Sequence, residues 1–498
     1  MGDPQKGDFA VAVTNGKPHL PFPDTMSEDD IKKEKRNIYK NILLISVAFL
    51  FNFNAFQGLS RLQSSLHKDE GMGVINSSVL YASLVLSCLF VPKILINQIG
   101  HKWTIPIAFS GYVLWMAANG YAVWGTMVTA SIIVGICAAP LWTAQCSYFT
   151  IIGKRYAELT GENENAVVTR FFGLFFFFFQ LSGITGSVIS YTVLRQDETN
   201  ITDFDNCGVN DCPGNDEGNS TSEAIPESTV WTMLGIYIAI AVVAILMVIF
   251  LVDNLPSELV EKEENVGQGI WKMLTATLYH LRHKEQLILI PLTMYSGFEQ
   301  ESYNAEFTAS FVTCSYGIWN VGLVTIPFGV VNALVSFSSG RIAKYTGRIP
   351  IFLAGFFMDL AIQITLMSWM PTPEESYVLF ILAGMWGFTD GIWQTQINAL
   401  YGVTFSSESE PAFSNYRMWE SFGFIIAFAY SSFICTSSKL YILTSFLCAG
   451  TIGFLVVEYL NYSKKGTDLD LAKKEAVMES TFTKEQNNIN MEQQVMKF

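Results

Sequence analysis

The segment "GMWGFTDGIWQTQINALYGVTF" (residues 384–405) joins two properties that seldom occur in one stretch of sequence. Its apolar residues are typical of a membrane-spanning helix, yet a carboxylate and three amides lie within nine residues of one another. These polar residues are Asp390, Gln394, Gln396 and Asn398. Polar groups inside a bilayer are costly, and they usually face protein or water. The segment therefore predicts a spanning helix whose polar side chains face into a helix bundle.

The composition extends this interpretation to the whole chain. Half of the 498 residues are hydrophobic and 15% are charged, whereas an ordinary soluble protein has about 25% charged residues. A spanning helix needs about 20 mostly apolar residues. Twelve such stretches lie near residues 40–59, 77–97, 104–123, 127–150, 167–194, 230–252, 286–306, 316–338, 349–369, 376–401, 412–435 and 438–460. We expect an all-α membrane protein with twelve transmembrane helices and an uncleaved first span.

The chain repeats itself after about 250 residues. "LWTAQCSY" in the fourth expected span matches "IWQTQINA" in the tenth, so Trp142 aligns with Trp393. The other matched pairs are Gln145 with Gln396, Gly100 with Gly347 and Arg170 with Arg417. Two six-helix halves related in this way are the organisation of major facilitator proteins. We expect halves at 38–252 and 286–460, a cytosolic linker with an interfacial helix at 253–285, and cytosolic tails at 1–37 and 461–498.

In a major facilitator layout, the first, fourth, seventh and tenth spans line a central cavity. The residues that we expect to supply its polar lining are Asn54, Gln145, Asp390, Gln394, Gln396 and Asn398. At the repeat offset of 251 residues Asp390 aligns with Ala139, so only one half carries the carboxylate. The alternative is that these groups only hold the helices together through interhelical hydrogen bonds.

A charged pair opens the eleventh expected span. Arg417 and Glu420 are three residues apart in "NYRMWESFGF", and side chains at this spacing are neighbours on one face of a helix. We expect a structural ion pair between them. Pairing of Arg417 with Asp390 of the tenth span is the alternative.

The basic residues predict the orientation of the chain in the membrane. With the N-terminus inside, the cytosolic segments hold most of the lysines and arginines near the span ends, as the positive-inside rule requires. Both termini are then cytosolic, and the loop at 195–229 is outside. This loop contains the sequons Asn200-Ile-Thr and Asn219-Ser-Thr. We expect both asparagines to carry glycans.

Four cysteines fall on the outer side of this topology. Cys207 and Cys212 are close together in the outer loop, and in an oxidising compartment they predict a local disulfide. Two free thiols in an acidic loop are the alternative. Cys314 and Cys435 lie near the outer ends of spans, and their pairing with each other is a further alternative.

No set of residues has the spacing of a catalytic centre. All five histidines lie outside the expected spans, and neither a phosphate-binding loop nor a nucleophile elbow is present. His280 and His283 have the spacing of metal ligands, but on an exposed helix face we interpret them as solvated. We therefore expect no enzyme activity, no metal, no cofactor and no nucleic-acid partner.

The loops after the second and eighth spans depart from the pattern G-x-L-A-D-R-x-G-R that major facilitator transporters usually carry there. The second copy, "GRIAKYTGR", keeps Gly340 and Gly347 but has Lys344 at the acidic position. The first copy, "KILINQIGHK", keeps Gly100 but has Asn97 at that position. Both carboxylates that usually pair with neighbouring helices are absent.

Three motifs give the chain a family resemblance over residues 38–460. "APLWTAQCSYFTIIG", "GIWQTQINALYG" and "AFSNYRMWESFGFIIAFAYS" resemble the uncoordinated-ninety-three homologs, especially their A-type branch. The resemblance implies the major facilitator fold. It also implies kinship with a founding member that regulates a two-pore-domain potassium channel complex, and with a B-type branch that escorts Toll-like receptors.

Three functions follow as hypotheses. The first is a non-catalytic, multi-pass regulator of a potassium channel complex in the cell membrane, with channel subunits and the lipid bilayer as partners. The second is a transporter of a small solute, proton-coupled through Asp390. The third is a trafficking chaperone for membrane receptors, which places the protein in an endomembrane.

Overall fold

A computed structural model describes residues 26–66, 72–194, 207–212, 227–256, 259, 275–317, 320–431 and 433–463, and these residues form helices without any strand. The helices are α1 (Glu28–Leu66), α2 (Met72–Ala118), α3 (Trp124–Thr160), α4 (Glu164–Leu194), α5 (Glu227–Leu251), α7 (Ala276–His280), α8 (Lys284–Glu301), α9 (Cys314–Tyr316), α10 (Val321–Thr346), α11 (Ile349–Ser368), α12 (Ser376–Thr404) and α13 (Ser409–Ser431), followed by Thr436–Ser463. Short turns include η4 (Gly208–Asn210), and η5 (Ser302–Thr313) is a π-helix between α8 and α9. The predicted all-α class is confirmed.

The described helices supply twelve membrane crossings. Eight of the described helices are long and apolar enough to span a membrane by length and composition, and they supply nine of these crossings. One of these, Asn76–Tyr121, has 46 residues and contains two crossings, because Gly100 breaks the helix with a positive φ of 82°. The remaining three crossings are α8 with η5, α12 and α13. Each of these three crossings buries several polar residues.

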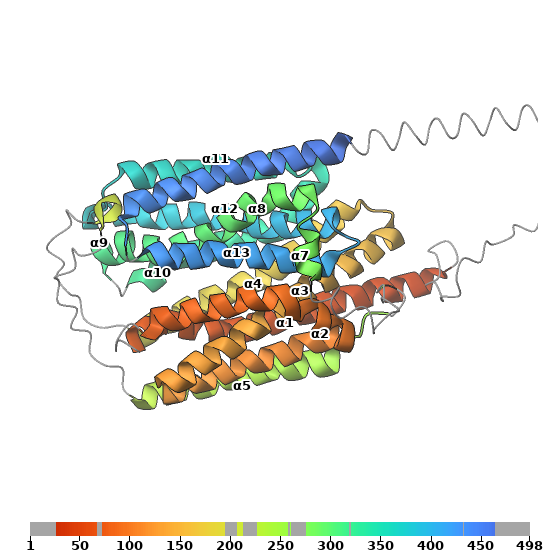
Figure 1. Ribbon diagram of the computed structural model, residues 1–498, viewed down its shortest axis with the longest axis horizontal. Helices are drawn as coiled ribbons and strands as arrows, with labels where there is room; N and C mark the ends of the chain where they lie inside the picture. Colours follow the sequence, from red (N-terminus) through yellow and green to blue (C-terminus); the bar gives the residue numbers. More distant parts are fainter. Residues whose placement is uncertain are drawn as a thin grey trace, which may run out of the picture.

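The two halves of the chain occupy two halves of the molecule. Figure 1 shows the red-to-yellow helices α1 to α4, with α5, in the lower part of the view, and α8 to α13 in the upper part. Both described chain ends lie at the right-hand end. Helix α1 begins at Glu28, so residues 28–37 of the segment expected to be a tail are helical. Acidic residues in its first turn, Glu28, Asp29 and Asp30, favour a helix start because they complement the helix dipole.

Pairs of helices join the two halves. Helix α4 packs on α10, and α2 packs on α13. In the first pair the rings of Phe177 and Phe337 lie 5.5 Å apart. In the second, Tyr81 stacks on Phe424 at 4.8 Å. These helices belong to opposite members of the sequence repeat, so the fold has the pseudosymmetry that the repeat predicts.

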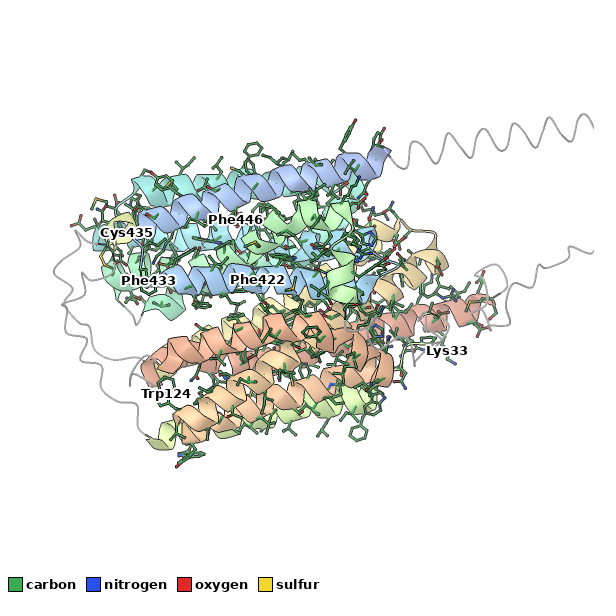
Figure 2. All side chains as sticks on the ribbon, viewed as in Figure 1. Lys33, Trp124, Phe422, Phe433, Cys435 and Phe446 are labelled. Carbon is green, nitrogen blue, oxygen red and sulfur yellow. A yellow bond between two sulfur atoms is a disulfide. The ribbon has the colours of Figure 1, made fainter. Side chains whose placement is uncertain are left out.

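Apolar side chains cover the outside of the bundle as well as its interior. Phe250, Phe357 and Ile452 are 76%, 62% and 63% exposed, which fits a surface that faces lipid rather than water. The two ends of the bundle carry different side chains. Figure 2 shows Lys33 at the end that carries the chain ends and Cys435 and Trp124 at the opposite end.

Candidate functional site

The polar stripe of the quoted segment lies on α12 and is fully enclosed. Asp390, Gln394 and Asn398 are 2%, 4% and 0% exposed, and their spacing of four residues places them on one face of the helix. Gln394 donates to the hydroxyl of Ser296 on α8 at 3.3 Å. Asn398 donates to the carbonyl of Gln394 at 2.7 Å. The stripe thus faces protein, and each of these side chains has a polar partner.

Asp390 connects three helices from both halves. Its Oδ2 accepts a hydrogen bond from Gln180 Nε2 on α4 at 3.3 Å and another from Asn332 Nδ2 on α10. Its Oδ1 has no hydrogen-bond partner among the described residues. Both donors are neutral amides, so this carboxylate does not pair with Arg417. The alternative of an Asp390–Arg417 pair is therefore wrong.

Arg417 lies within a buried network around Glu420. Its Nη1 donates to Glu420 Oε2 at 2.6 Å, and its guanidinium lies 4.4 Å from the ring centre of Trp142 on α3. Glu420 also accepts from Ser296 at 2.8 Å and from Tyr416 at 3.1 Å. The pairing is the one expected from their spacing. The carboxylate is bound by several donors, which is how buried charges are normally stabilised.

A second contact between the halves joins α3 to α12 and α13. Cys146 Sγ lies 3.3 Å from both Gln145 Oε1 and Asn398 Oδ1, and Arg417 Nη2 donates to the same Asn398 oxygen at 3.4 Å. Thr143 and Ser414 lie 3.3 Å apart across the interface. The side chains predicted to line a cavity are here buried between helices of the two halves.

Two residues predicted to line the cavity form hydrogen bonds within their own half. Asn54 on α1 donates to Thr185 on α4 at 2.6 Å. Gln396 donates to Ser339 on α10 at 2.6 Å. Gln396 also borders a cavity of about 270 Å³ at the end of the bundle that carries the chain ends. This cavity is lined by Asn163, Asn165, Ala166, Thr169, Ala343, Lys344, Gly347, Arg348, Gln396 and Glu458.

The three glycines of the degenerate signature loops have structural roles. Gly100 and Gly347 have φ values of 82° and 75°, which favour glycine because it lacks a Cβ. Gly340 lies where α10 meets α4, and a Cβ there would come within 2.3 Å of the Arg170 Cα. The loops therefore keep their backbone turns and their close packing, although the usual carboxylates are absent.

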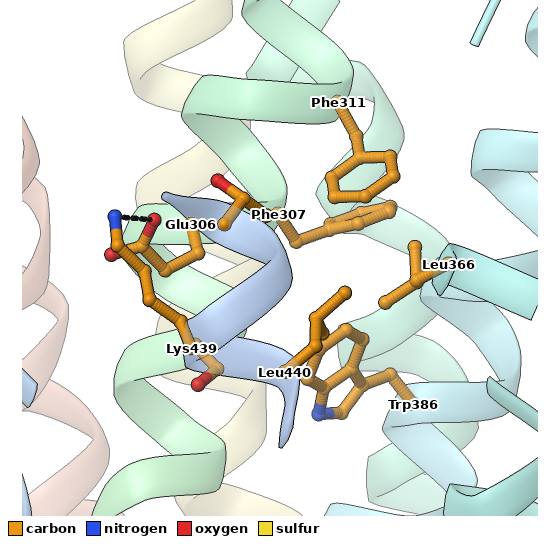
Figure 3. Close-up of a pocket in the computed structure, with 9 residues that line it drawn as sticks. Glu306, Phe307, Phe311, Leu366, Trp386, Lys439 and Leu440 are labelled. Carbon is orange, nitrogen blue, oxygen red and sulfur yellow. Dashed lines mark hydrogen bonds and ion pairs between the residues drawn. The ribbon is translucent and has the colours of Figure 1, made fainter. Parts of the chain in front are cut away.

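A buried ion pair lies near the opposite end of the bundle. Lys439 Nζ is 2.6 Å from Glu306 Oε2, and both side chains are more than nine-tenths buried. Figure 3 shows the pair beside Phe307, Phe311 and Trp386, at a cavity of about 10 Å³. That volume holds about one water molecule. The two residues are 133 positions apart, so no local pattern in the sequence marked them as partners.

Residues 207–212, which belong to the loop that the sequence predicts to be outside, are joined to the C-terminal half by two disulfides. Cys207 bonds Cys314, and Cys212 bonds Cys435, with Cα–Cα distances of 5.6 and 4.1 Å. The predicted Cys207–Cys212 disulfide is therefore wrong, and so is the alternative Cys314–Cys435 pair. The cause lies in tertiary structure, because η4 turns between the two loop cysteines and directs each to a different element.

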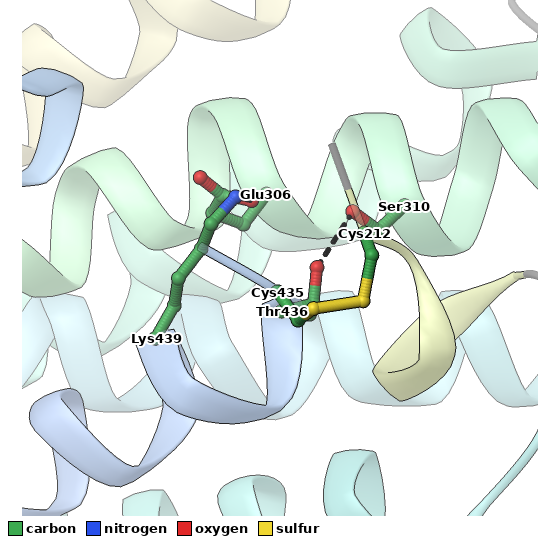
Figure 4. Close-up of a disulfide and its surroundings, with 6 residues drawn as sticks. All are labelled: Cys212, Glu306, Ser310, Cys435, Thr436 and Lys439. Carbon is green, nitrogen blue, oxygen red and sulfur yellow. Dashed lines mark hydrogen bonds and ion pairs between the residues drawn. A yellow bond between two sulfur atoms is a disulfide. The ribbon is translucent and has the colours of Figure 1, made fainter. Parts of the chain in front are cut away.

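Hydrogen bonds accompany the second disulfide. The amide of Thr436 donates to the carbonyl of Asp211 at 2.9 Å. The Thr436 hydroxyl lies 3.2 Å from that of Ser310, and Figure 4 shows both beside the Cys212–Cys435 bond. Residues 207–212 are thus bound to the C-terminal half by covalent and polar contacts. Asn200 and Asn219, the predicted glycan sites, lie outside the described residues.

At the end with the chain termini, two histidines meet a glutamate. His280 Nδ1 lies 3.0 Å from Glu408 Oε2, and His283 Nε2 lies 3.4 Å from the same oxygen. Burial and the neighbouring His283 together lower the pKa of His280, although its contact with Glu408 acts to raise it. Burial raises the pKa of the Glu408 carboxyl, but the two histidines together lower it by more. The interpretation of both histidines as solvated is wrong for His280, which is 1% exposed.

Comparison with known proteins now places the chain. A family model described as "Ion channel regulatory protein UNC-93" matches residues 67–455. The chain belongs to the UNC-93 family. Unc-93 homolog A of Xenopus laevis is 44% identical over 88% of this chain and 97% of its own length. The human homolog A is 40% identical over 84% of this chain and 93% of its own.

A more distant member of the UNC-93 family carries a functional name. A Caenorhabditis elegans protein named as a potassium channel regulatory protein, unc-93, is 33% identical over 91% of this chain and 66% of its own length. Among solved structures, the human organic anion transporter MFSD10 covers 84% of this chain with a TM-score of 0.61 and 12% identity. The outward conformation of FucP gives 0.60 with the same coverage and identity. The predicted major facilitator fold is confirmed.

Proposed function

We propose that this UNC-93 family member is a non-catalytic regulatory subunit that acts on potassium channel subunits in the cell membrane. The observation that carries the proposal is its 33% identity, over 91% of the chain, to a worm protein named as a potassium channel regulator. Two features of the fold support it. The polar residues between the halves are bound to one another, and the signature loops lack their carboxylates.

The test is electrical. The protein is co-expressed with two-pore-domain potassium channel subunits, and potassium currents are compared with those of the channel alone and of the protein alone. We expect a changed current in the first case and none in the last. Unchanged currents across several channels, with both proteins at the cell surface, would contradict the proposal. If Toll-like receptors instead co-purified with the protein from endosomes, a trafficking role would be favoured.

A second candidate function rests on Asp390. Its carboxylate is enclosed between the halves, accepts from two neutral amides and has one oxygen without a partner among the described residues. A group in this position is suited to carry a proton during solute transport. Proton-coupled transport predicts that Asp390→Asn abolishes proton uptake while the protein still reaches the surface. Unchanged activity in that variant would remove this candidate.

We further propose that both termini are cytosolic. Lys33 and other basic residues lie at the end with the chain ends, as the positive-inside rule favours. The two disulfides lie at the opposite end (Figure 2), and disulfides persist in oxidising compartments. The two signals agree on one orientation.

A further inference from the structure

Two histidines three residues apart and a glutamate far from them in the sequence form a compact group at the end of the bundle that carries the ends of the described chain. His280 ends α7 and His283 follows it, whereas Glu408 lies in the turn between α12 and α13. One ligand atom of each residue lies within 4.8 Å of the others. We propose that His280, His283 and Glu408 bind a divalent transition-metal ion of the zinc class.

The distances agree with tetrahedral coordination. Zinc binds histidine nitrogen at about 2.0–2.1 Å and carboxylate oxygen at about 2.0–2.2 Å, which places neighbouring ligand atoms about 3.3–3.4 Å apart. The His280 Nδ1 to Glu408 Oε2 distance is 3.0 Å, and the His283 Nε2 to Glu408 Oε2 distance is 3.4 Å. The Glu408 oxygen need move by only a few tenths of an ångström relative to each histidine. If the two imidazoles also come closer to each other, the three ligand atoms can bind one ion. Two histidines and one glutamate are also a set that zinc uses in proteins.

The surrounding residues orient the ligands and leave the site accessible to an ion from solvent. His280 is 1% exposed, and the ring of Phe405 packs against it at 4.8 Å and against His283 at 6.2 Å. His280 Nε2 has no partner among the described residues, so Nδ1 is the nitrogen that faces the group. The side chains of His283 and Glu408 are 44% and 46% exposed. An ion can enter from solvent, and water can take the fourth position.

The position of α7 indicates what the ion would do. Thr277 of α7 donates to the Cys88 carbonyl on α2 at 2.9 Å, and its own carbonyl accepts from Asn415 on α13 at 2.7 Å. Helix α7 therefore contacts both halves. An ion shared by α7 and the α12–α13 turn would hold the linker in this place, and it would strengthen the contact between the halves at this end.

The test uses the full-length protein purified in detergent, stripped with a chelator and titrated with Zn²⁺ against a competing indicator dye. We expect one tightly bound Zn²⁺ per chain, and Co²⁺ in its place should give the visible absorption of a tetrahedral site. His283→Gln should abolish Zn²⁺ binding and the Co²⁺ absorption. This variant should fold normally, because His283 is half-exposed. His283→Cys, which restores a ligand atom, should recover binding.

A matched control is the other histidine–glutamate pair at this end. His101 Nε2 lies 3.3 Å from Glu410 Oε1, but its further partner is the hydroxyl of Ser147 instead of a second histidine. His101→Gln should leave Zn²⁺ binding unchanged. Hydrogen exchange of residues 276–283 should slow with Zn²⁺ in the wild type and in His101→Gln, but not in His283→Gln. Equal binding by the wild type and His283→Gln would overturn the proposal, as would no binding by the wild type.

Discussion

Arg417 is a buried guanidinium whose charge is balanced by one carboxylate. Its side chain is 8% exposed and that of Glu420 is 6% exposed. The aromatic rings of Trp142 and Tyr416 lie 4.4 and 4.6 Å from the guanidinium, and such faces attract a cation without neutralising it. The network that surrounds the pair contains residues of α3, α8, α12 and α13. Loss of either charge therefore affects several helices at once.

We predict that Glu420→Gln strongly reduces delivery to the cell surface. The change leaves the Arg417 charge uncompensated, and removal of one partner of a buried pair costs about 3–5 kcal/mol. Surface biotinylation measures the effect. Adding Arg417→Gln should recover part of the delivery, because neither charge is then buried alone. The control is Asp253→Asn, which breaks the half-exposed pair with Lys40 and should cost less than about 1 kcal/mol.

Single residues also show where sequence reasoning reaches its limit. The buried polar positions of α12 were evident from a carboxylate and amides in an apolar segment. The partners of Asp390 were not, because Asn332 and Gln180 occur in other helices and carry no local signal. Asp359 illustrates the same limit. Its bonds from Tyr295 and Trp393 depend on how α8, α11 and α12 pack, which the spacing of residues along one helix does not encode.

Between elements, the contact of α4 with α10 depends on small residues. Gly340 of α10 faces the backbone of Arg170, and Gly173 of α4 faces the carbonyl of Ser336, where a Cβ would come within 2.2 Å. Small residues let spanning helices approach closely, and such packing drives helix association in the bilayer. The glycine of the degenerate signature is thus part of the contact between the two halves.

We predict that Gly340→Ala lowers the thermal unfolding midpoint of the purified protein. The added methyl group would lie 2.3 Å from the Arg170 Cα, and overpacking of this kind costs about 1–3 kcal/mol. Gly235→Ala on α5 is the matched control, because no atom of the described residues lies within 4 Å of the place that its methyl group would occupy. That change should leave the midpoint equal or higher, since alanine favours a helix. Equal effects of the two variants would argue against the close contact.

The disulfides predict a definite peptide map. Digestion without reductant by a protease that cleaves before Asp211 should give one linked pair that contains Cys207 and Cys314 and another that contains Cys212 and Cys435. A peptide with Cys207 bonded to Cys212 would contradict the structure. The bonds close 107 and 223 residues of chain, so replacing Cys212 and Cys435 together by serine should lower stability by about 2–5 kcal/mol.

These disulfides explain why the loop was only partly predictable. The sequence indicated an outer loop with cysteines in an oxidising compartment, and the structure places all four cysteines at one end. The pairing was not predictable, because nearness along the chain favoured Cys207 with Cys212. The helix bundle instead brings Cys314 and Cys435 to the same end as η4. The twelve crossings and the two halves could be predicted from hydropathy and from the repeat, because both are local patterns in the sequence.

At the scale of the whole molecule, the two ends differ in chemistry. One end carries both ends of the described chain, Lys33 and the group of His280, His283 and Glu408. The other carries two disulfides and the buried Glu306–Lys439 pair. An oxidising compartment on one side and a reducing one on the other would suit this division.

The whole-molecule prediction is that Asn200 and Asn219 carry glycans and that both termini are cytosolic. Each asparagine is seven residues from a cysteine that is fixed at the disulfide end. Seven residues span at most about 25 Å, less than the roughly 30 Å hydrocarbon core, so neither asparagine can reach the far side. An N-glycosidase should increase the mobility of the wild type but not of the Asn200→Gln, Asn219→Gln double variant. A C-terminal epitope should bind antibody only after cells are permeabilised, and binding to intact cells would reverse the orientation.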